Sequence, residues 1–156
     1  MTLRASEERP ASDMTIRLLE SDADILAAFR LMSVLRERVS PDTFLAEVRR
    51  QQRDGYQLIG GFLDGTLVAL AGSRPAHTLS RGEHVFVDDL VTDPDRRGEG
   101  HGTAMLAWIA SRAKAAGIRR IYLDSRATAS GFYEQVGFTM MTSIPCWIDV
   151  ERLAST

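Results

Sequence analysis

Residues 93–102 read DPDRRGEGHG and join two segments of different pattern. The segment before them, residues 83–92, has apolar residues at alternate and at neighbouring positions, as a central strand covered on both faces requires. The segment after them, residues 102–116, has the apolar spacing of a helix, and Gly117 favours an end there. The pattern therefore predicts a buried strand, a glycine-rich loop and a helix in direct succession.

The loop carries glycine at every second position, as Gly98, Gly100 and Gly102. Glycine lets the backbone approach a ligand closely, and the start of the helix offers unpaired N–H groups and the positive end of its dipole. Arg96 and Arg97 add positive charge beside these groups. The junction is a candidate anion site, although a turn at a helix start also needs glycine for purely steric reasons.

Two common nucleotide-binding motifs do not fit this spacing. A Walker loop requires Gly-Lys followed by Ser or Thr, and the loop contains no lysine. A Rossmann fingerprint requires a third glycine at the position where Thr103 stands. The anion, if one binds, is therefore held by a different type of loop.

Composition and charge limit the classes of partner. The 156 residues are 44% hydrophobic and 26% charged, which predicts one globular domain over 14–156 after a flexible tail at 1–13. The formal net charge is -2, so no overall basic field favours nucleic acid, and no apolar run in the tail favours a membrane span. The single Cys146 excludes an internal disulfide and favours a reducing cytoplasm. Three scattered histidines give no metal-ligand spacing.

The remaining segments predict an α+β or mixed α/β sheet. Asp64-Gly65 is typical of a tight hairpin, Asp22 or Asp24 would cap the first helix, and Ser40-Pro41 would begin the second. Further helices are expected over 22–39, 41–54 and 128–136, and further strands over 15–19, 56–63, 66–73, 121–123 and 138–150.

A second motif lies at residues 129–138, which read ASGFYEQVGF. Aromatic residues on a helix usually serve packing, and Phe132 and Tyr133 alone would favour that interpretation. The pair is followed by Gly137-Phe138, and with residues 97–102 (RGEGHG) before it the chain resembles the GNAT acetyltransferases. The first signature of that family reads Gln/Arg-x-x-Gly-x-Gly/Ala. The resemblance covers residues 14–150.

This resemblance implies the GNAT fold, a central mixed and mostly antiparallel sheet of about six to seven strands flanked by about four helices. It also implies acetyl-CoA as co-substrate, with its pyrophosphate on the loop amides and its pantetheine arm along the strand end. Tyr133 would protonate the departing CoA thiolate, and Ser130 would contact the co-substrate or cap its helix. The residues expected at acetyl-CoA are Leu90, Val91, Thr92, Arg96, Arg97, Gly98, Gly100, His101, Gly102, Thr103, Ser130 and Tyr133.

An ammonium substrate must lose a proton before it attacks, so an acidic or imidazole group is expected beside the acetyl group. Strand alternation places His84 and Asp88 on one face, and the resemblance to GNAT members that act on polyamines favours Asp88 as the base. Asp89, Glu83 and His84 are alternatives, and a β-bulge would exchange the roles of the two aspartates. A purely structural aspartate paired with an arginine has equal weight.

The acceptor is expected between the splayed strands and the first helices, with Leu35, Phe44, Tyr56 and Phe86 as lining residues. We therefore expect direct acetyl transfer from acetyl-CoA to a primary amine of a small molecule or peptide. A non-catalytic acyl-CoA sensor and a structural interaction protein are the alternatives. The sequence leaves open which amine is acetylated, which acyl chain is preferred, and whether the chain forms a homodimer.

Overall fold

The structure, a computed structural model, describes residues 13–154. The predicted flexible tail at 1–13 lies outside the described residues except for Asp13. The chain divides after Asp124 into two compact units, each with its own internal contacts.

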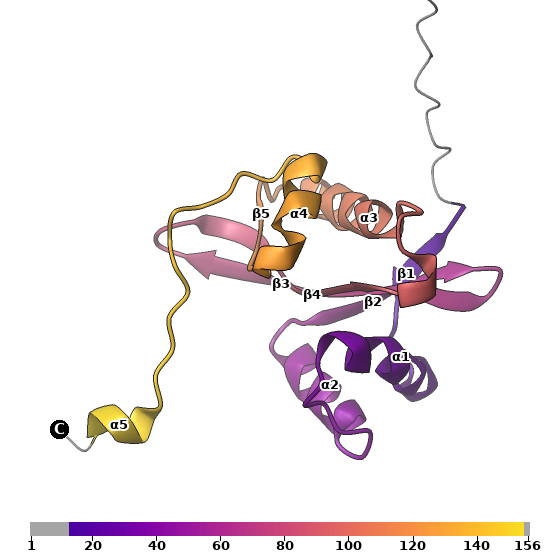
Figure 1. Cartoon of the computed structure of the whole chain (residues 1–156), viewed down its shortest axis with the longest axis horizontal. Coiled ribbons are helices and arrows are strands. Elements are labelled where there is room, and N and C mark those ends of the chain that lie inside the picture. Colours follow the sequence, from indigo (N-terminus) through magenta and orange to yellow (C-terminus); the bar gives the residue numbers. More distant parts are fainter. Residues whose placement is uncertain (1–12, 155–156) are drawn as a thin grey trace, which may run out of the picture. The chain divides into compact units, whose positions relative to one another are not determined.

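The first unit is built on one five-stranded sheet, in which the strands lie in sequence order (Figure 1). Neighbouring strands run antiparallel from β1 to β4, and β5 runs parallel to β4. This arrangement places β4 inside the sheet with a neighbour on each side. The strands are β1 (Thr15–Leu18), β2 (Gln57–Leu63), β3 (Thr66–Thr78), β4 (Gly82–Thr92) and β5 (Ile121–Leu123).

Helices cover both faces of this sheet (Figure 1). On one face lie α1 (Asp22–Leu35) and α2 (Phe44–Arg53), whose apolar side chains form a buried core with those of the strands. On the other face lies α3 (His101–Ala115), which follows the short 3-10 helix η1 (Pro94–Arg96) and contacts β3 and β4. The predicted mixture of helices and one mixed sheet is confirmed.

The first helix begins and ends differently from the prediction. Its N-cap is Ser21, whose hydroxyl accepts the N–H of Asp24 at 3.1 Å, and not Asp22 or Asp24 itself. It ends at Leu35 rather than near residue 39, because Arg36 adopts φ −121° and ψ 87°, outside the helical region. The early end brings the Arg36 side chain to β4.

The second helix begins at Phe44 rather than at Pro41. The carbonyl of Ser40 accepts the N–H groups of both Thr43 and Phe44, which makes residues 40–43 a separate turn before the helix. Helical structure therefore covers two stretches of 22–53, with the connection between them longer than predicted.

Strand β3 continues to Thr78 instead of ending at residue 73. Its last pair with β2 is Ser73 with Gln57, and beyond it β3 pairs with β4 alone. Pro75 consequently lies where β3 is an edge, and a residue without an N–H donor is tolerated there.

The predicted hairpin at Asp64-Gly65 is confirmed. Asp64 has φ 47° and Gly65 has φ 78°, the positive values that a two-residue turn of this type requires. The flanking residues Leu63 and Thr66 pair with each other, which fixes the register of β2 with β3.

The second unit contains the 3-10 helix η2 (Ala127–Ala129), α4 (Ser130–Val136) and α5 (Val150–Ala154). The predicted helix at 128–136 is confirmed, and it ends at Gly137, which adopts φ 113°. Within residues 13–154, no helix has the length and apolar character needed to cross a membrane.

Residues 138–149 contain no strand, so the prediction of a strand over 138–150 is wrong. Pro145 cannot donate to a ladder of hydrogen bonds. The large apolar side chains of the segment also lack a face to pack on, since Ile144 is 82% exposed and Trp147 is 86% exposed. The sheet of the described residues accordingly has five strands instead of the six to seven expected.

Candidate active site

The two aspartates of β4 lie at a β-bulge. Gly72 of β3 pairs with Asp89, and the next residue, Ser73, pairs with Val87, so Asp88 is an extra residue without a partner on β3. A bulge of this kind interrupts the alternation of side chains along a strand. Asp88 and Asp89 consequently line the same cavity instead of facing opposite sides of the sheet.

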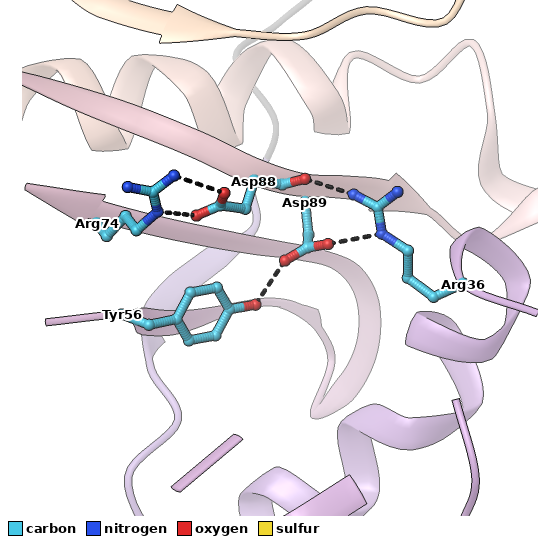
Figure 2. A network of polar contacts seen from close by, with 5 residues as sticks. All are labelled: Arg36, Tyr56, Arg74, Asp88 and Asp89. Carbon is cyan, nitrogen blue, oxygen red and sulfur yellow. Dashed lines mark hydrogen bonds and ion pairs between the residues drawn. The ribbon is translucent and has the colours of Figure 1, made fainter. Parts of the chain in front are cut away.

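Asp89 is held at both carboxylate oxygens (Figure 2). The Tyr56 hydroxyl donates to Oδ2 at 2.8 Å, and Nε of Arg36 donates to Oδ1 at 2.8 Å. Burial of Tyr56, and then the negative charge of Asp89, raises the pKa of the phenol far above its ordinary value. Tyr56 is therefore a neutral donor to Asp89 at any physiological pH.

The Asp88 carboxylate is paired with a second arginine, Arg74 (Figure 2). Nε of Arg74 donates to Oδ2 at 2.9 Å and Nη2 donates to Oδ1 at 3.3 Å, while the guanidinium lies 5.0 Å from the centre of the Phe86 ring. The side chain of Asp88 is 28% exposed, against 12% for Asp89. Asp88 is thus the more accessible of the two carboxylates.

A cavity of about 610 Å³ opens beside these carboxylates. Met32, Phe44 and Val48 of the helices give it apolar walls, and Glu47 and Gln51 of α2 add polar groups. A pocket of this size with a few convergent polar groups suits a small organic molecule. Among the described residues, no group of three His, Cys, Asp or Glu side chains lies close enough to hold a metal ion.

The bulge changes which residues of β4 share a face. Directly paired residues of an antiparallel pair lie on the same face, and Phe86 pairs with Arg74 whereas Asp89 pairs with Gly72. Residues 84 and 86 therefore share their face with 89 and 91, in place of the predicted 88 and 90. The bulge thus interrupts the alternation on which the predicted face of Asp88 rested, and both aspartates line the cavity.

Two of the four candidates for the base do not reach the cavity. Glu83 is exposed at the start of β4. His84 is buried, with Nδ1 at 2.8 Å from the carbonyl oxygen of Gly82 and its ring packed edge-on against Tyr122 of β5. His84 is a packed structural histidine in this arrangement, so of the four predicted candidates Asp88 and Asp89 line the cavity.

Two of the four residues expected to line the acceptor site lie at this cavity. Phe44 and Tyr56 line the cavity, whereas Leu35 and Phe86 do not. Sequence reasoning missed Arg36 and Arg74, the two arginines that pair with the aspartates. One signal was present: partly buried acids inside an apolar strand require cationic partners.

The glycine loop has an open conformation. Gly98 adopts φ 79° and Gly100 adopts φ 84°, and a Cβ placed on either would meet no atom within 4 Å. α3 begins directly after Gly100 and has no side-chain cap. Gly102 and Thr103 lie in the first turn of this 15-residue helix, and the N-terminus of a helix is a favourable place for an anion.

The charged side chains of the loop bind one another. Nε of Arg96 donates to a carboxylate oxygen of Glu99 at 2.9 Å, and Nε2 of His101 lies 2.8 Å from the same oxygen. The bond from Arg96, followed by that to His101, lowers the pKa of Glu99. The His101 ring is buried, whereas the Arg96 side chain is 43% exposed and Arg97 is exposed.

The last part of β4 has an open edge. The parallel pairing with β5 covers Val85–Val87, and in the described part of the chain no strand continues it along Leu90–Thr92. Val91 packs in the core under α1 and α2, while Leu90 and Thr92 are half-buried. Such an edge presents backbone N–H and C=O groups to an extended ligand.

The second unit holds the other predicted residues. Tyr133 is buried, with its ring centre 5.0 Å from that of Phe132 and 5.5 Å from that of Phe138. This burial raises the pKa of the Tyr133 phenol. The Ser130 hydroxyl donates to the carbonyl of Ala127 at 3.0 Å, and Ser130 is the first residue of α4 rather than its N-cap.

Comparisons with known proteins agree on one family. The Acetyltransferase (GNAT) family matches residues 24–138. An uncharacterised N-acetyltransferase of Bacillus subtilis is 29% identical over 130 residues, which are 80% of this chain and 92% of that protein. A glucosamine 6-phosphate N-acetyltransferase of Trypanosoma brucei brucei is 26% identical over 132 residues, or 81% and 89% of the two chains. The fold is shared with an aminoglycoside N-acetyltransferase in complex with CoA, at a TM-score of 0.77 and 18% identity over 88% of this chain and 95% of that one.

Proposed function

The chain belongs to the GNAT family and is an acetyl-CoA-dependent N-acetyltransferase, and on that premise we propose that it transfers the acetyl group directly to a primary amine of a small molecule or peptide. The observation that carries this proposal is the cavity of about 610 Å³ with the paired carboxylates of Asp88 and Asp89 among its lining groups. A carboxylate at this place attracts an ammonium group and can then take its proton.

The loop fits the phosphates of acetyl-CoA. Gly98 and Gly100 leave space at their Cα atoms, and the uncapped start of α3 supplies N–H groups with a favourable dipole. We propose that the amides of 97–103 hold the pyrophosphate, that Arg96 and Arg97 add charge, and that the open edge at 90–92 pairs with the pantetheine arm. Acetyl-CoA supplies a thioester carbonyl carbon that a neutral amine can attack.

We propose Asp88 as the base, acting through water. Both oxygens of Asp89 are bound by Tyr56 and Arg36, and its side chain is less exposed than that of Asp88. Within the described chain, the Asp88 carboxylate is bound by Arg74 alone, whose side chain is 42% exposed and therefore in contact with solvent. An incoming ammonium group would compete with this guanidinium for the Asp88 carboxylate.

We propose Tyr133 as the acid that protonates the CoA thiolate. Its position in the Phe-Tyr motif supports this role, and a phenol, with an ordinary pKa of about 10, is protonated at neutral pH. A protonated phenol can donate to a departing thiolate, whereas a phenolate cannot. Ser130 is proposed as a neighbouring contact to the co-substrate.

The acceptor is proposed to be a small polar amine. Apolar helix walls beside paired arginines and acids suit a molecule that has both a carbon skeleton and several polar groups. The names of two similar proteins point the same way, because one acts on glucosamine 6-phosphate and the other on aminoglycosides. Amino sugars are therefore the first compounds to test.

The test is turnover of acetyl-CoA with a panel of amino sugars, amino acids, polyamines and peptide amines, read as acetylated product by mass spectrometry. We expect one class to be acetylated and Asp88→Asn to reduce kcat by about 100-fold or more. Asp64→Asn is the matched control, because Asp64 lies in the β2–β3 hairpin and outside the cavity. Binding of acetyl-CoA without turnover of any amine would contradict the proposal and favour a non-catalytic sensor.

A further inference from the structure

The side chain of Arg36, at the end of α1, binds both residues of the β4 bulge (Figure 2). Its Nε donates to the Asp89 carboxylate at 2.8 Å, and its Nη2 donates to the backbone carbonyl of Asp88 at 2.5 Å. One guanidinium thus binds the side chain of one bulge residue and the main chain of the other. The planar fork of arginine can span two such acceptors at once, whereas the single ammonium of lysine is a point charge.

The backbone position of Arg36 is also fixed. Arg36 is the C-cap of α1, and its own N–H donates to the Met32 carbonyl at 2.8 Å. The early end of α1 at Leu35 is therefore the feature that directs the guanidinium toward β4.

Tyr56, which directly precedes β2, also supports the bulge. Its ring is buried against Gly72, the residue of β3 that pairs with Asp89, and a Cβ on Gly72 would overlap the phenol. The phenol donates to the Asp89 oxygen that Arg36 does not bind. Asp89 is consequently fixed from two directions, by a cation and by a neutral donor.

We propose that Arg36 is a positioning residue, which holds the β4 bulge in the form that presents the Asp88 carboxylate to the acceptor cavity, and that Asp89 and Tyr56 complete this support. The inference rests on the proposed function, because it assigns the orientation of the proposed base. In this proposal Asp89 fixes the geometry of the bulge, and Asp88 takes the proton from the substrate ammonium group.

Because Arg36 is partly exposed, its effect on the geometry of the bulge can be distinguished from its effect on the stability of the fold. Its side chain is 43% exposed, and ion pairs that reach solvent contribute little to the free energy of unfolding. Loss of the fork would instead leave the Asp88 carbonyl without its donor and allow the bulge to relax. Small displacements of a reacting group are costly, since about 1 Å can reduce a rate by about 100-fold.

The experiment compares Arg36→Lys with Arg17→Lys. Arg17 also forms a forked pair, with the carboxylate of Asp24 at 2.7 and 3.0 Å, but it lies away from the cavity. For Arg36→Lys we expect kcat to fall by about tenfold to 100-fold with an unchanged KM for acetyl-CoA. We also expect faster hydrogen exchange of the amides at 88–90, and a melting temperature equal to that of Arg17→Lys. Arg17→Lys should keep the kcat and the exchange of the unaltered protein.

Unchanged exchange at 88–90 in Arg36→Lys would overturn the inference, and so would an unchanged kcat. Exchange is measured without any substrate, so this arm remains decisive if the unaltered protein acetylates no amine and the proposed function fails. Tyr56→Phe is the second variant, because it removes one hydroxyl and leaves the ring in place. Its effect on kcat should not add fully to that of Arg36→Lys, since both act through Asp89. Full additivity would contradict a shared support.

Discussion

Asp88 and Asp89 are neighbours in the sequence but have different surroundings. The Asp89 carboxylate is bound by a buried phenol and an arginine, whereas the Asp88 carboxylate is bound by one half-exposed arginine and has the larger exposed fraction. The sequence predicted an acidic pair beside the acceptor, and both acids do line the cavity. It did not predict their different partners, because the meeting of Arg36 and Arg74 with β4 depends on a bulge that no residue type specifies.

The hydroxyl of Tyr133 gives a prediction about kcat. Tyr133→Phe should reduce kcat by about 100-fold or more, because the phenylalanine has no proton to donate, while the affinity for acetyl-CoA stays unchanged. Steady-state kinetics and calorimetry measure the two quantities. Tyr122→Phe is the control, since Tyr122 lies on β5 and has no assigned role. Equal kcat values for Tyr133→Phe and the unaltered protein would remove Tyr133 from the acid role.

Gly72 gives a prediction of stability. In Gly72→Ala the new methyl group would overlap the buried Tyr56 ring, so we expect the free energy of unfolding to fall by about 1–3 kcal/mol. Gly131→Ala is the control, because a Cβ there meets no atom within 4 Å and alanine favours the helix. Urea denaturation compares the two variants. A Gly72→Ala protein as stable as Gly131→Ala would show that the phenol can move aside without cost.

At the scale of elements, the strand, loop and helix around residues 83–116 follow the prediction closely. β4 ends at Thr92 and α3 begins at His101, because the apolar pattern and the glycines specify both local conformation and burial. The prediction of a strand at 138–149 failed for the opposite reason. An apolar run favours a strand only where a sheet edge and a packing face receive it, and a sequence pattern does not report whether they do.

The two ends of α3 provide a matched pair of variants. Gly100 and Gly117 flank the helix, both have positive φ (84° and 77°), and both have open space at the Cα atom. Valine at either position should cost similar stability through backbone strain. Only Gly100→Val should weaken acetyl-CoA binding, because only that end carries the proposed phosphate site.

Calorimetric titration of acetyl-CoA into both folded variants checks this expectation. Thermal melting first establishes that the two proteins are equally folded. If Gly100→Val binds acetyl-CoA as tightly as Gly117→Val, the phosphates lie elsewhere.

At the scale of the whole molecule, three carboxylates with lowered pKa values predict how stability depends on pH. The pKa of Asp24 is lowered by its bond from Arg17, that of Asp93 by the N–H of Asp95, and that of Glu99 by Arg96. A carboxyl with a lower pKa in the folded chain stabilises the fold above its unfolded pKa of about 4. That contribution is lost as the pH falls through the folded values.

The free energy of unfolding should therefore be level from about pH 7 to pH 5 and fall below about pH 4. Urea denaturation across this range measures it. Asp24→Asn should have a shallower slope in acid, because one of the three titrating groups is gone. A slope that is unchanged in this variant would argue against the Arg17 pair as a source of the acid sensitivity.

One more consequence concerns the sulfhydryl of Cys146. It is the single cysteine of the chain, it is exposed, and it lies in the strand-free segment of the second unit. Chromogenic disulfide reagents that report liberated coenzyme will also modify this thiol, adding up to one equivalent of colour per polypeptide. Assays of that kind should therefore read the steady slope after this initial burst, and the same lone thiol gives a selective attachment point for a fluorophore.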